Sequence, residues 1–217
     1  MTRKQTTIIA VAVGLALLVL LPVVAVGILL YVRKTQEVAP PPDGAEVIAK
    51  ADWVEVIPKS YWVIGPFGPG LDKSYEPEQQ QDPTKPCKTP AGKELEWVVK
   101  PVIPGVLCLD FRKAFKQKNT DDTAAYALVY VHSAKNQAGE LLLGSDDTIT
   151  VWLNGAQVHQ NLRLRPGVPD DDTAAVEWKQ GSNTLLIKVG NGKGDHLFFA
   201  KLRGPAELRA STTKISE

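Results

Sequence analysis

The chain has 217 residues, of which 25 are Lys or Arg and 24 are Asp or Glu, so its formal net charge at pH 7 is +1. Nucleic-acid binding needs a strongly basic surface, and this near balance argues against nucleic acid as a partner. Hydrophobic residues make up 44% and charged residues 23% of the chain, as in an ordinary folded domain.

An apolar segment, residues 8–32, contains no charged residue. A helix of this length, rising about 1.5 Å per residue, crosses a hydrocarbon core of roughly 30 Å. A cleaved signal peptide is the alternative, but its apolar region is only about 7–15 residues long. We therefore expect a transmembrane anchor at residues 8–32 in contact with the lipid bilayer, preceded by a short cytoplasmic tail at residues 1–7.

Basic residues flank this apolar segment on both sides, Arg3 and Lys4 before it and Arg33 and Lys34 after it. The positive-inside rule gives only a slight preference for a cytoplasmic amino terminus. Residues 33–46 contain three consecutive prolines, which favour an extended, stiff spacer. We expect a single-pass protein whose folded domain, residues 47–203, lies outside the cytoplasm, followed by a loose tail at residues 204–217.

The downstream part of the chain has the patterns of short β-strands. The segments are rich in β-branched, aromatic and aliphatic residues and are separated by Gly, Asn, Asp or Pro. Asn154-Gly155, between two of them, is a strong hairpin signal. The sequence therefore predicts an all-β fold, an antiparallel jelly-roll β-sandwich preceded by a single N-terminal transmembrane helix. The expected strands are residues 61–64, 94–99, 106–110, 123–133, 140–145, 148–155, 156–162, 174–178, 183–190 and 196–202, with one helical turn at 112–118.

The triplet Asp-Asp-Thr occurs three times, starting at Asp121, Asp146 and Asp171. The residues after each triplet share little, so an internal repeat is not indicated. Asp stabilises turns through its side chain, and Thr is well suited to begin a strand, so a turn followed by a strand explains each copy. The alternative is a Ca²⁺ site, because paired aspartates from adjacent loops supply the oxygen ligands that this ion prefers.

The two cysteines, Cys87 and Cys108, fit one disulfide if the domain lies in an oxidising compartment. Two unpaired thiols are the alternative. Catalytic motifs such as G-x-S-x-G and H-E-x-x-H are absent from the sequence, and the three histidines fall in different expected strands. We therefore predict that the protein is not an enzyme and holds no cofactor, apart from the possible Ca²⁺.

Five tryptophans occur in the downstream part, at positions 53, 62, 97, 152 and 178. We expect at least three of them in the core. An exposed indole can stack on a sugar ring while neighbouring polar side chains bind the hydroxyl groups. Tryptophan is thus the residue type here that most favours a carbohydrate site.

Several strings resemble one known type of domain. They are WVIGPFGPG from Trp62, YEPE from Tyr75, LLLGSDDTITVWLNGAQVH from Leu141 and GSNTLLIKVGNGKGDHLFFAKL from Gly181. Together they resemble galactose-binding-like β-sandwich modules related to the sugar-binding domain of family 2 glycoside hydrolases, which occur in bacterial envelope proteins. The resemblance covers roughly residues 53–203.

The resemblance is specific for the fold and far weaker for the ligand. Together with the expected anchor, it leads us to expect a single-pass bacterial membrane protein whose periplasmic or extracellular domain binds a glycan at the cell envelope without catalysis. The expected ligand-binding residues are Trp152, Asp146, Asp147, Asn154 and Arg165. The alternative is an accessory subunit that docks on a partner membrane protein through its sandwich and its transmembrane helix. A glycan module exposes an aromatic residue beside polar side chains, whereas a docking subunit exposes a broad apolar or charged surface.

Overall fold

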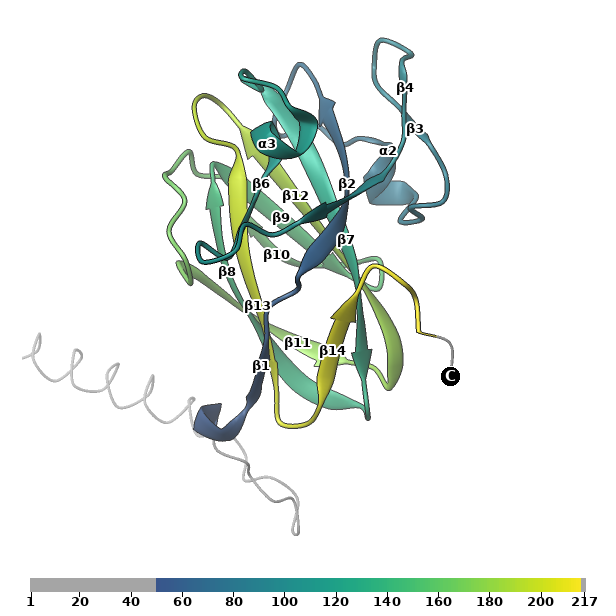
Figure 1. Cartoon of the computed structure of the whole chain (residues 1–217), viewed down its shortest axis with the longest axis vertical. Coiled ribbons are helices and arrows are strands. Elements are labelled where there is room, and N and C mark those ends of the chain that lie inside the picture. Colours follow the sequence, from purple (N-terminus) through teal and green to yellow (C-terminus); the bar gives the residue numbers. More distant parts are fainter. Residues whose placement is uncertain (1–49, 216–217) are drawn as a thin grey trace, which may run out of the picture. The chain divides into compact units, whose positions relative to one another are not determined.

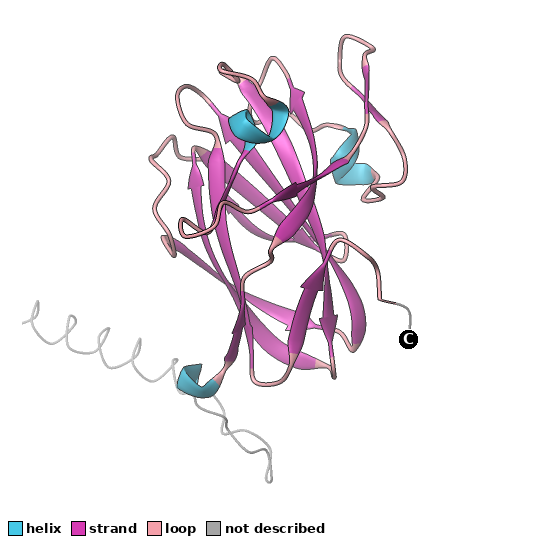
Figure 2. Ribbon diagram, in the orientation of Figure 1, coloured by secondary structure: helices cyan, strands magenta, loops and turns pink. Residues whose placement is uncertain are grey.

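The computed structural model describes residues 50–215, which form an all-β domain of antiparallel sheets (Figure 1). Strands make up most of it, and its helices are short (Figure 2). No helix within residues 50–215 has the length and hydrophobicity needed to span a bilayer. The expected anchor at residues 8–32, the tail at 1–7 and the spacer at 33–46 lie outside the described residues.

Two sheets form the sandwich. Sheet A has the strand order β1-β13-β8-β11, and β6 also pairs with β13. Sheet B has the order β10-β9-β12-β7-β2-β5, and β14 also pairs with β7. A third, two-stranded sheet is formed by β3 and β4. The strands of sheet A are β1 (Val54–Val56), β6 (Cys108–Asp110), β8 (Gln137–Asp146), β11 (Asp172–Trp178) and β13 (Leu197–Gly204). Those of sheet B are β2 (Ser60–Phe67), β5 (Val98–Pro101), β7 (Thr123–Ser133), β9 (Thr148–Leu153), β10 (Ala156–Asn161), β12 (Gly181–Asn191) and β14 (Leu208–Ser211).

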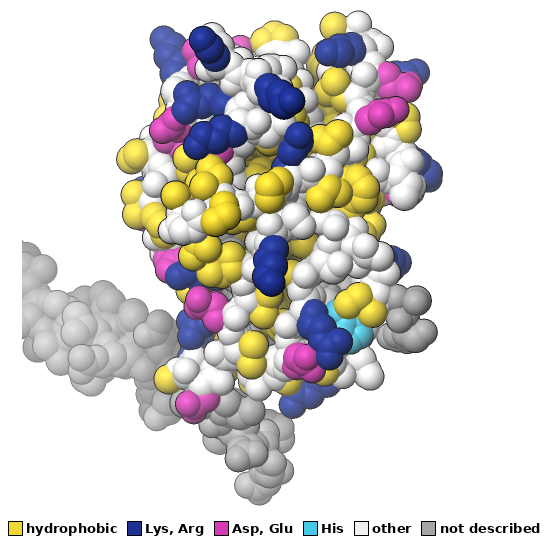
Figure 3. Space-filling view, in the orientation of Figure 1, with side chains coloured by type: hydrophobic (Ala, Val, Ile, Leu, Met, Phe, Trp, Pro, Cys, Tyr) yellow, Lys and Arg dark blue, Asp and Glu magenta, His cyan; other side chains and the backbone are white. Residues whose placement is uncertain are grey.

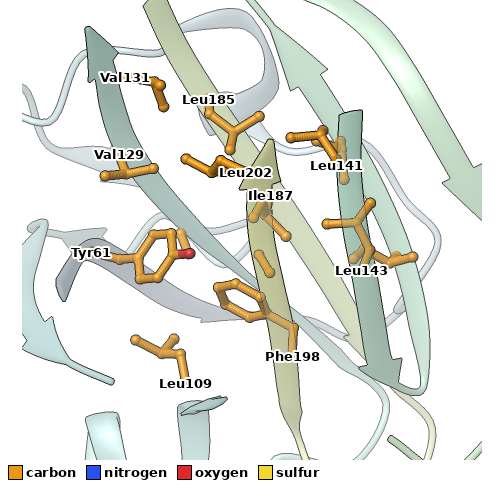
Figure 4. Close-up of a cluster of buried hydrophobic side chains, with 14 of the residues drawn as sticks. Tyr61, Leu109, Val129, Val131, Leu141, Leu143, Leu185, Ile187, Phe198 and Leu202 are labelled. Atoms are coloured by element: carbon orange, nitrogen blue, oxygen red, sulfur yellow. The ribbon is translucent and has the colours of Figure 1, made fainter. Parts of the chain in front are cut away.

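The main core lies between the two sheets (Figure 4). Successive side chains of a strand point to opposite faces of its sheet, so every second residue of each strand can contribute to this core. Ile149, Val151 and Leu153 of β9 all join this core. Figure 4 shows Phe198, Leu202 and Leu143 of sheet A facing Val129, Leu185 and Ile187 of sheet B.

A second apolar cluster covers the opposite face of sheet B. Its members are Ile64, Phe67, Tyr75, Cys87, Trp97, Ala124, Tyr126, Leu128, Trp152 and Leu186. Several of them come from the long connection between β2 and β5, which carries α2 (Glu76–Gln79), β3 (Cys87–Lys88) and β4 (Glu94–Leu95). Sheet B is therefore buried on both faces where this connection lies over it.

Most expected strands are confirmed, with shifted ends. The expected strand 94–99 is divided between β4 and β5, and the expected helical turn is α3 (Phe111–Phe115). The sequence pattern predicted no element after residue 203, yet β14 pairs with β7 from Ser133 to Tyr130. This part of β7 lies beyond the residues that pair with β2, and its backbone groups need hydrogen-bond partners.

Candidate functional site

The structure brings the three Asp-Asp-Thr triplets to one end of the sandwich. The backbone N–H of Gly192 donates to Oδ2 of Asp147 at 2.8 Å, and the N–H of Gly194 donates to Oδ1 of Asp121 at 3.4 Å. Both glycines belong to the connection between β12 and β13. The first two triplets therefore share one neighbouring loop, and the third reaches the second through Arg165.

Arg165 is a buried hub between two of these triplets. Its guanidinium donates to Asp171 Oδ2 at 2.8 Å, to Asp172 Oδ1 at 3.0 Å and to Ser145 Oγ at 3.0 Å, and it forms an ion pair with Asp172. Its backbone N–H donates to Asp147 Oδ1 at 3.0 Å. The Arg165 side chain is only 10% exposed. Arg165 was predicted to bind a ligand. In the structure its guanidinium contacts Asp171, Asp172 and Ser145 and thereby holds the β10–β11 connection to the sandwich, so little of it is accessible to a ligand.

Asp172 carries the charge that balances this arginine. Burial opposes ionisation, yet hydrogen bonds from Arg165, Asn161 and His159 lower the pKa of Asp172 to about 2. His159 Nε2 lies 3.2 Å from Asp172 Oδ2. A buried ion pair with several hydrogen bonds, such as that of Arg165 and Asp172, is typical of a structural network.

Asp146 is a half-buried carboxylate of this end with few partners. Burial, followed by repulsion from the neighbouring Asp147, raises its pKa, and within residues 50–215 its carboxylate accepts one hydrogen bond, from the N–H of Gly167 at 3.3 Å. The expected metal residues Asp121, Asp146 and Asp171 do not converge. Among residues 50–215 no group of three or more His, Cys, Asp or Glu side chains is arranged to hold a metal ion. The Ca²⁺ site thus remains a sequence-based hypothesis without a ligand cluster in this region.

Asn154 lies away from these aspartates. It is the first residue of the tight β9–β10 hairpin, with a positive φ of 52°, whereas Asp147 immediately precedes the other end of β9. Its side chain binds Asn183 Oδ1 at 2.8 Å and accepts from the N–H of Thr184 at 2.9 Å. The predicted set of five ligand residues is therefore not one site, because β9 separates Asn154 from Asp147 by its whole length.

Trp152 borders a small polar pocket on the outer face of sheet B. The pocket has a volume of about 90 Å³, and Thr148, Thr150 and Trp152 of β9 lie along it. Gln157 and Gln160 of β10 and Lys188 of β12 extend this wall, and the β2–β5 connection supplies the opposite one. Trp152 is 9% exposed and belongs to the second apolar cluster, so only a small part of the indole can touch a ligand.

A buried ion pair closes the pocket. Lys188 Nζ lies 2.9 Å from Glu78 Oε1, which also accepts from the Tyr126 hydroxyl at 2.7 Å. Lys188 Nζ donates as well to the carbonyl of Lys73. Burial opposes ionisation of Glu78, but the hydrogen bonds from Tyr126, Lys188 and Ser74 outweigh it and lower the pKa of Glu78. The pocket therefore holds a fixed negative and a fixed positive group beside neutral amides and hydroxyls.

Sequence reasoning identified Trp152 but missed its polar neighbours Gln157, Gln160, Glu78 and Lys188. The first two lie on β10 beside β9, where Gln157 pairs with Trp152 and Gln160 with Thr150. The alternation of Thr148, Thr150 and Trp152 was a signal for one polar face. Glu78 comes from a connection whose position over sheet B no local pattern indicates.

The expected disulfide is absent. Cys87 and Cys108 are both buried free thiols. Cys87 lies in β3 within the second apolar cluster, on the outer side of sheet B, whereas Cys108 lies in β6 at the edge of sheet A. The prediction of a Cys87–Cys108 bridge is wrong for this structure because the two strands belong to different layers. Burial raises the pKa of both thiols, which keeps them unreactive.

No known family model matches the sequence, and no curated protein matches it. Among solved structures, the PA14 domain of the antifreeze protein MpAFP is 15% identical with a TM-score of 0.35, covering 74% of this chain and 69% of that chain. The PA14 sugar-binding domain from an RTX adhesin is 12% identical with a TM-score of 0.37, covering 73% and 76%. The GH31 α-xylosidase from Xanthomonas citri is 8% identical with a TM-score of 0.30, and the match covers 75% of this chain and 20% of the xylosidase chain.

At this distance the likeness assigns neither a family nor a ligand to the chain. None of these three structures is a family 2 glycoside hydrolase, so that part of the predicted resemblance stays a prediction.

Proposed function

We propose that this protein is a non-catalytic module that binds a glycan in the polar pocket beside Trp152, on a jelly-roll-type sandwich anchored outside the cytoplasm by residues 8–32. The observation that carries the proposal is the composition of the pocket wall. An indole edge lies beside two threonines, two glutamines and an ion pair, which together offer both donors and acceptors. Sugar hydroxyl groups need both, and they need an apolar surface for the C–H groups between them.

The size of the pocket restricts what enters it. At about 90 Å³ it has room for about three water molecules, each of which occupies about 30 Å³ in the liquid. It therefore accepts one edge of a sugar ring with two or three hydroxyl groups and leaves the rest of a chain outside. A terminal or side-branch sugar fits this description.

The charged residues of the pocket argue for binding and against hydrolysis. A general acid at neutral pH needs a raised pKa, and the pKa of Glu78 is lowered by Tyr126, Lys188 and Ser74. Its carboxylate already accepts three hydrogen bonds, at 2.7 Å from Ser74, 2.7 Å from Tyr126 and 2.9 Å from Lys188. Glu78 thus serves to position Lys188 and the connection that carries α2.

The test is binding of the full chain in detergent micelles to a glycan array, followed by titration of the best ligands. Gln157→Ala combined with Gln160→Ala removes two exposed amides of the pocket and leaves the core unchanged. We expect affinity to fall about tenfold for each hydrogen bond lost. Gln79→Ala with Gln180→Ala, two exposed amides outside the pocket, is the matched control. Equal affinity of both double variants contradicts the assignment of the pocket.

A second candidate function, docking on a partner membrane protein, is favoured by the β10–β11 connection. Leu162, Leu164 and Val168 of this connection are 53%, 68% and 47% exposed. Clusters of exposed apolar residues often mark protein interfaces. The two candidate functions are distinguished by gentle detergent extraction of the native membrane, size separation and mass spectrometry of the co-migrating proteins. A docking subunit migrates in fixed proportion with its partner, whereas a glycan-binding module migrates alone.

A further inference from the structure

The surface around α3 carries two shallow hollows and is rich in cations. One hollow of about 380 Å³ is lined by Asp110, Gln117 and four basic side chains, those of Arg112, Lys113, Lys116 and Lys118. A second hollow of about 230 Å³ shares Asp110 and Lys113 with the first and adds Lys100. We call the two together the basic hollow. Figure 3 shows Lys and Arg side chains gathered over this end of the molecule.

Few negative charges offset these cations. Asp110 is buried, forms the N-cap of α3 through the N–H of Lys113, and lies 3.4 Å from Lys113 Nζ. Asp195 forms an ion pair with Arg112. Within residues 50–215, Lys100, Lys116 and Lys118 form no ion pair. The hollow therefore keeps an excess of positive charge, although the whole chain carries a formal charge of only +1.

The floor of the second hollow is apolar. It is formed by Pro101, Val102, Ile103, Pro104 and Ala114. An apolar floor with charged groups around it is the usual composition of a site for a small ring that carries a charge. Sugar rings with a carboxylate or sulfate have this character, since their C–H faces are apolar and their substituent is anionic.

The basic hollow lies at the end of the sandwich where β9 begins with Thr148, one residue of the Trp152 pocket. The segment after α3 is held there by Thr120, whose hydroxyl contacts His196 Nδ1 at 3.1 Å and accepts from Asn191 at 3.1 Å. Gly190 pairs with Thr148, a residue of the pocket wall. The described chain begins at Lys50 in η1 (Lys50–Asp52), at the opposite end of the long axis (Figure 1). The basic hollow thus lies at the end of the domain opposite to the point where the described chain begins.

We propose that the basic hollow binds the acidic groups of a polyanionic glycan, so that the ligand of this protein is a carboxylated or sulfated polymer. This inference rests on the proposed function and names its substrate class. We name a glycan because the apolar floor of the second hollow, beside Lys100 and Lys113, suits a ring that carries an acidic group, and an anionic bilayer is an outcome of the test below.

The experiment compares three proteins as full chains in detergent on one array of carboxylated, sulfated and neutral glycans. The first is the natural chain. The second carries Lys113→Gln, Lys116→Gln and Lys118→Gln, which removes three cations of the hollow. The third carries Lys85→Gln, Lys88→Gln and Lys93→Gln, which removes three exposed cations from the β3–β4 region and serves as the control. Thermal melts check that all three proteins are folded.

We expect the natural chain and the control to prefer acidic glycans, with an affinity that falls as salt is added. The hollow variant should lose about tenfold in affinity for these glycans and keep any neutral binding. If all three proteins bind neutral glycans with equal affinity and show no preference for acidic ones, the acidic substrate class is wrong, while the proposed glycan-binding function is retained. The Gln157→Ala, Gln160→Ala variant of the previous test is run on the same array. Acidic binding that is lost with the three lysines but unaffected by these two glutamines supports the hollow and overturns the pocket.

Two further outcomes count against the inference. Absence of binding to every glycan overturns both proposals. Binding of the natural chain to vesicles with anionic lipids, together with no binding to acidic glycans, shows that the hollow serves a membrane surface.

Discussion

Acid should destabilise the domain through one buried histidine. His196 is 0% exposed and packs on Phe111 with ring centroids 4.9 Å apart. Its Nε2 lies 3.0 Å from the carbonyl oxygen of Val189, so Nε2 carries a proton and donates it. Nδ1 then accepts from the Thr120 hydroxyl at 3.1 Å. A second proton on this ring would remove that acceptor and place a charge in the core.

The magnitude follows from the pKa of His196 in the two states. Burial lowers it from 6.5 to about 4 in the folded protein, against weaker opposing effects from Val189 and Asp110. Other charged groups that act on the ring are Asp147, which raises its pKa, and Arg112, which lowers it. The unfolded state therefore binds the proton first as the pH falls below about 6.5. Stability is complete above this value and is lost toward pH 4, by about 2 kcal/mol between pH 7.5 and 5.

Urea denaturation at pH 7.5, 6.5, 5.5 and 5.0, followed by tryptophan fluorescence, measures this loss. Trp178, 1% exposed, is a suitable reporter of the core. The control is His196→Gln, which is less stable at neutral pH but cannot take up the proton. The two other histidines stay in both proteins, so their contribution cancels in the comparison. Equal pH slopes for the natural chain and the variant would refute the reasoning.

Three other perturbations test the rest of the structure. Arg165→Ala should lower the free energy of unfolding by about 3 kcal/mol, because it leaves Asp172 buried without its cation. An NMR titration of the variant should show the pKa of Asp172 rising from about 2. An unchanged pKa would contradict the role of Arg165 as the partner of Asp172. Gly144→Ala places a Cβ against the carbonyl oxygen of Val168, closer than van der Waals contact allows, and should cost about 1–3 kcal/mol. Faster proteolysis within residues 162–171 is the readout, and protection equal to that of the natural chain would contradict the contact. Trp178→Phe removes the indole N–H that donates to the Arg203 carbonyl at 3.1 Å, so a loss of about 1–2 kcal/mol is expected in urea, and no change would show that this carbonyl finds another donor.

Local sequence patterns identified most of the sheet. The expected strand at residues 123–133 coincides with β7. Alternation along residues 148–152 separates Ile149 and Val151 from Trp152, and in the structure the first two lie in the main core and Trp152 in the second cluster. Strand periodicity and turn residues act between near neighbours, so a single sequence records them. At least three tryptophans were expected in the core, and Trp97, Trp152 and Trp178 are buried.

Local patterns did not show where the β2–β5 connection lies. Its position over sheet B places Glu78 beside Lys188, two residues 110 positions apart, and so creates the pocket. It also holds Cys87 in a different layer from Cys108, which is why two cysteines suited to a bridge by their number remain separate.

The sequence by itself determined the all-β class, most strand positions and which face of β9 is polar, because these depend on alternation along one strand. Only the tertiary structure decided which polar groups meet. Arg165 was expected to bind a ligand and instead holds Asp171 and Asp172, while Asn154 of the same predicted set lies at the far end of β9. Side chains distant in the sequence meet through the pairing of strands and the paths of long connections, and these depend on the packing of the whole domain.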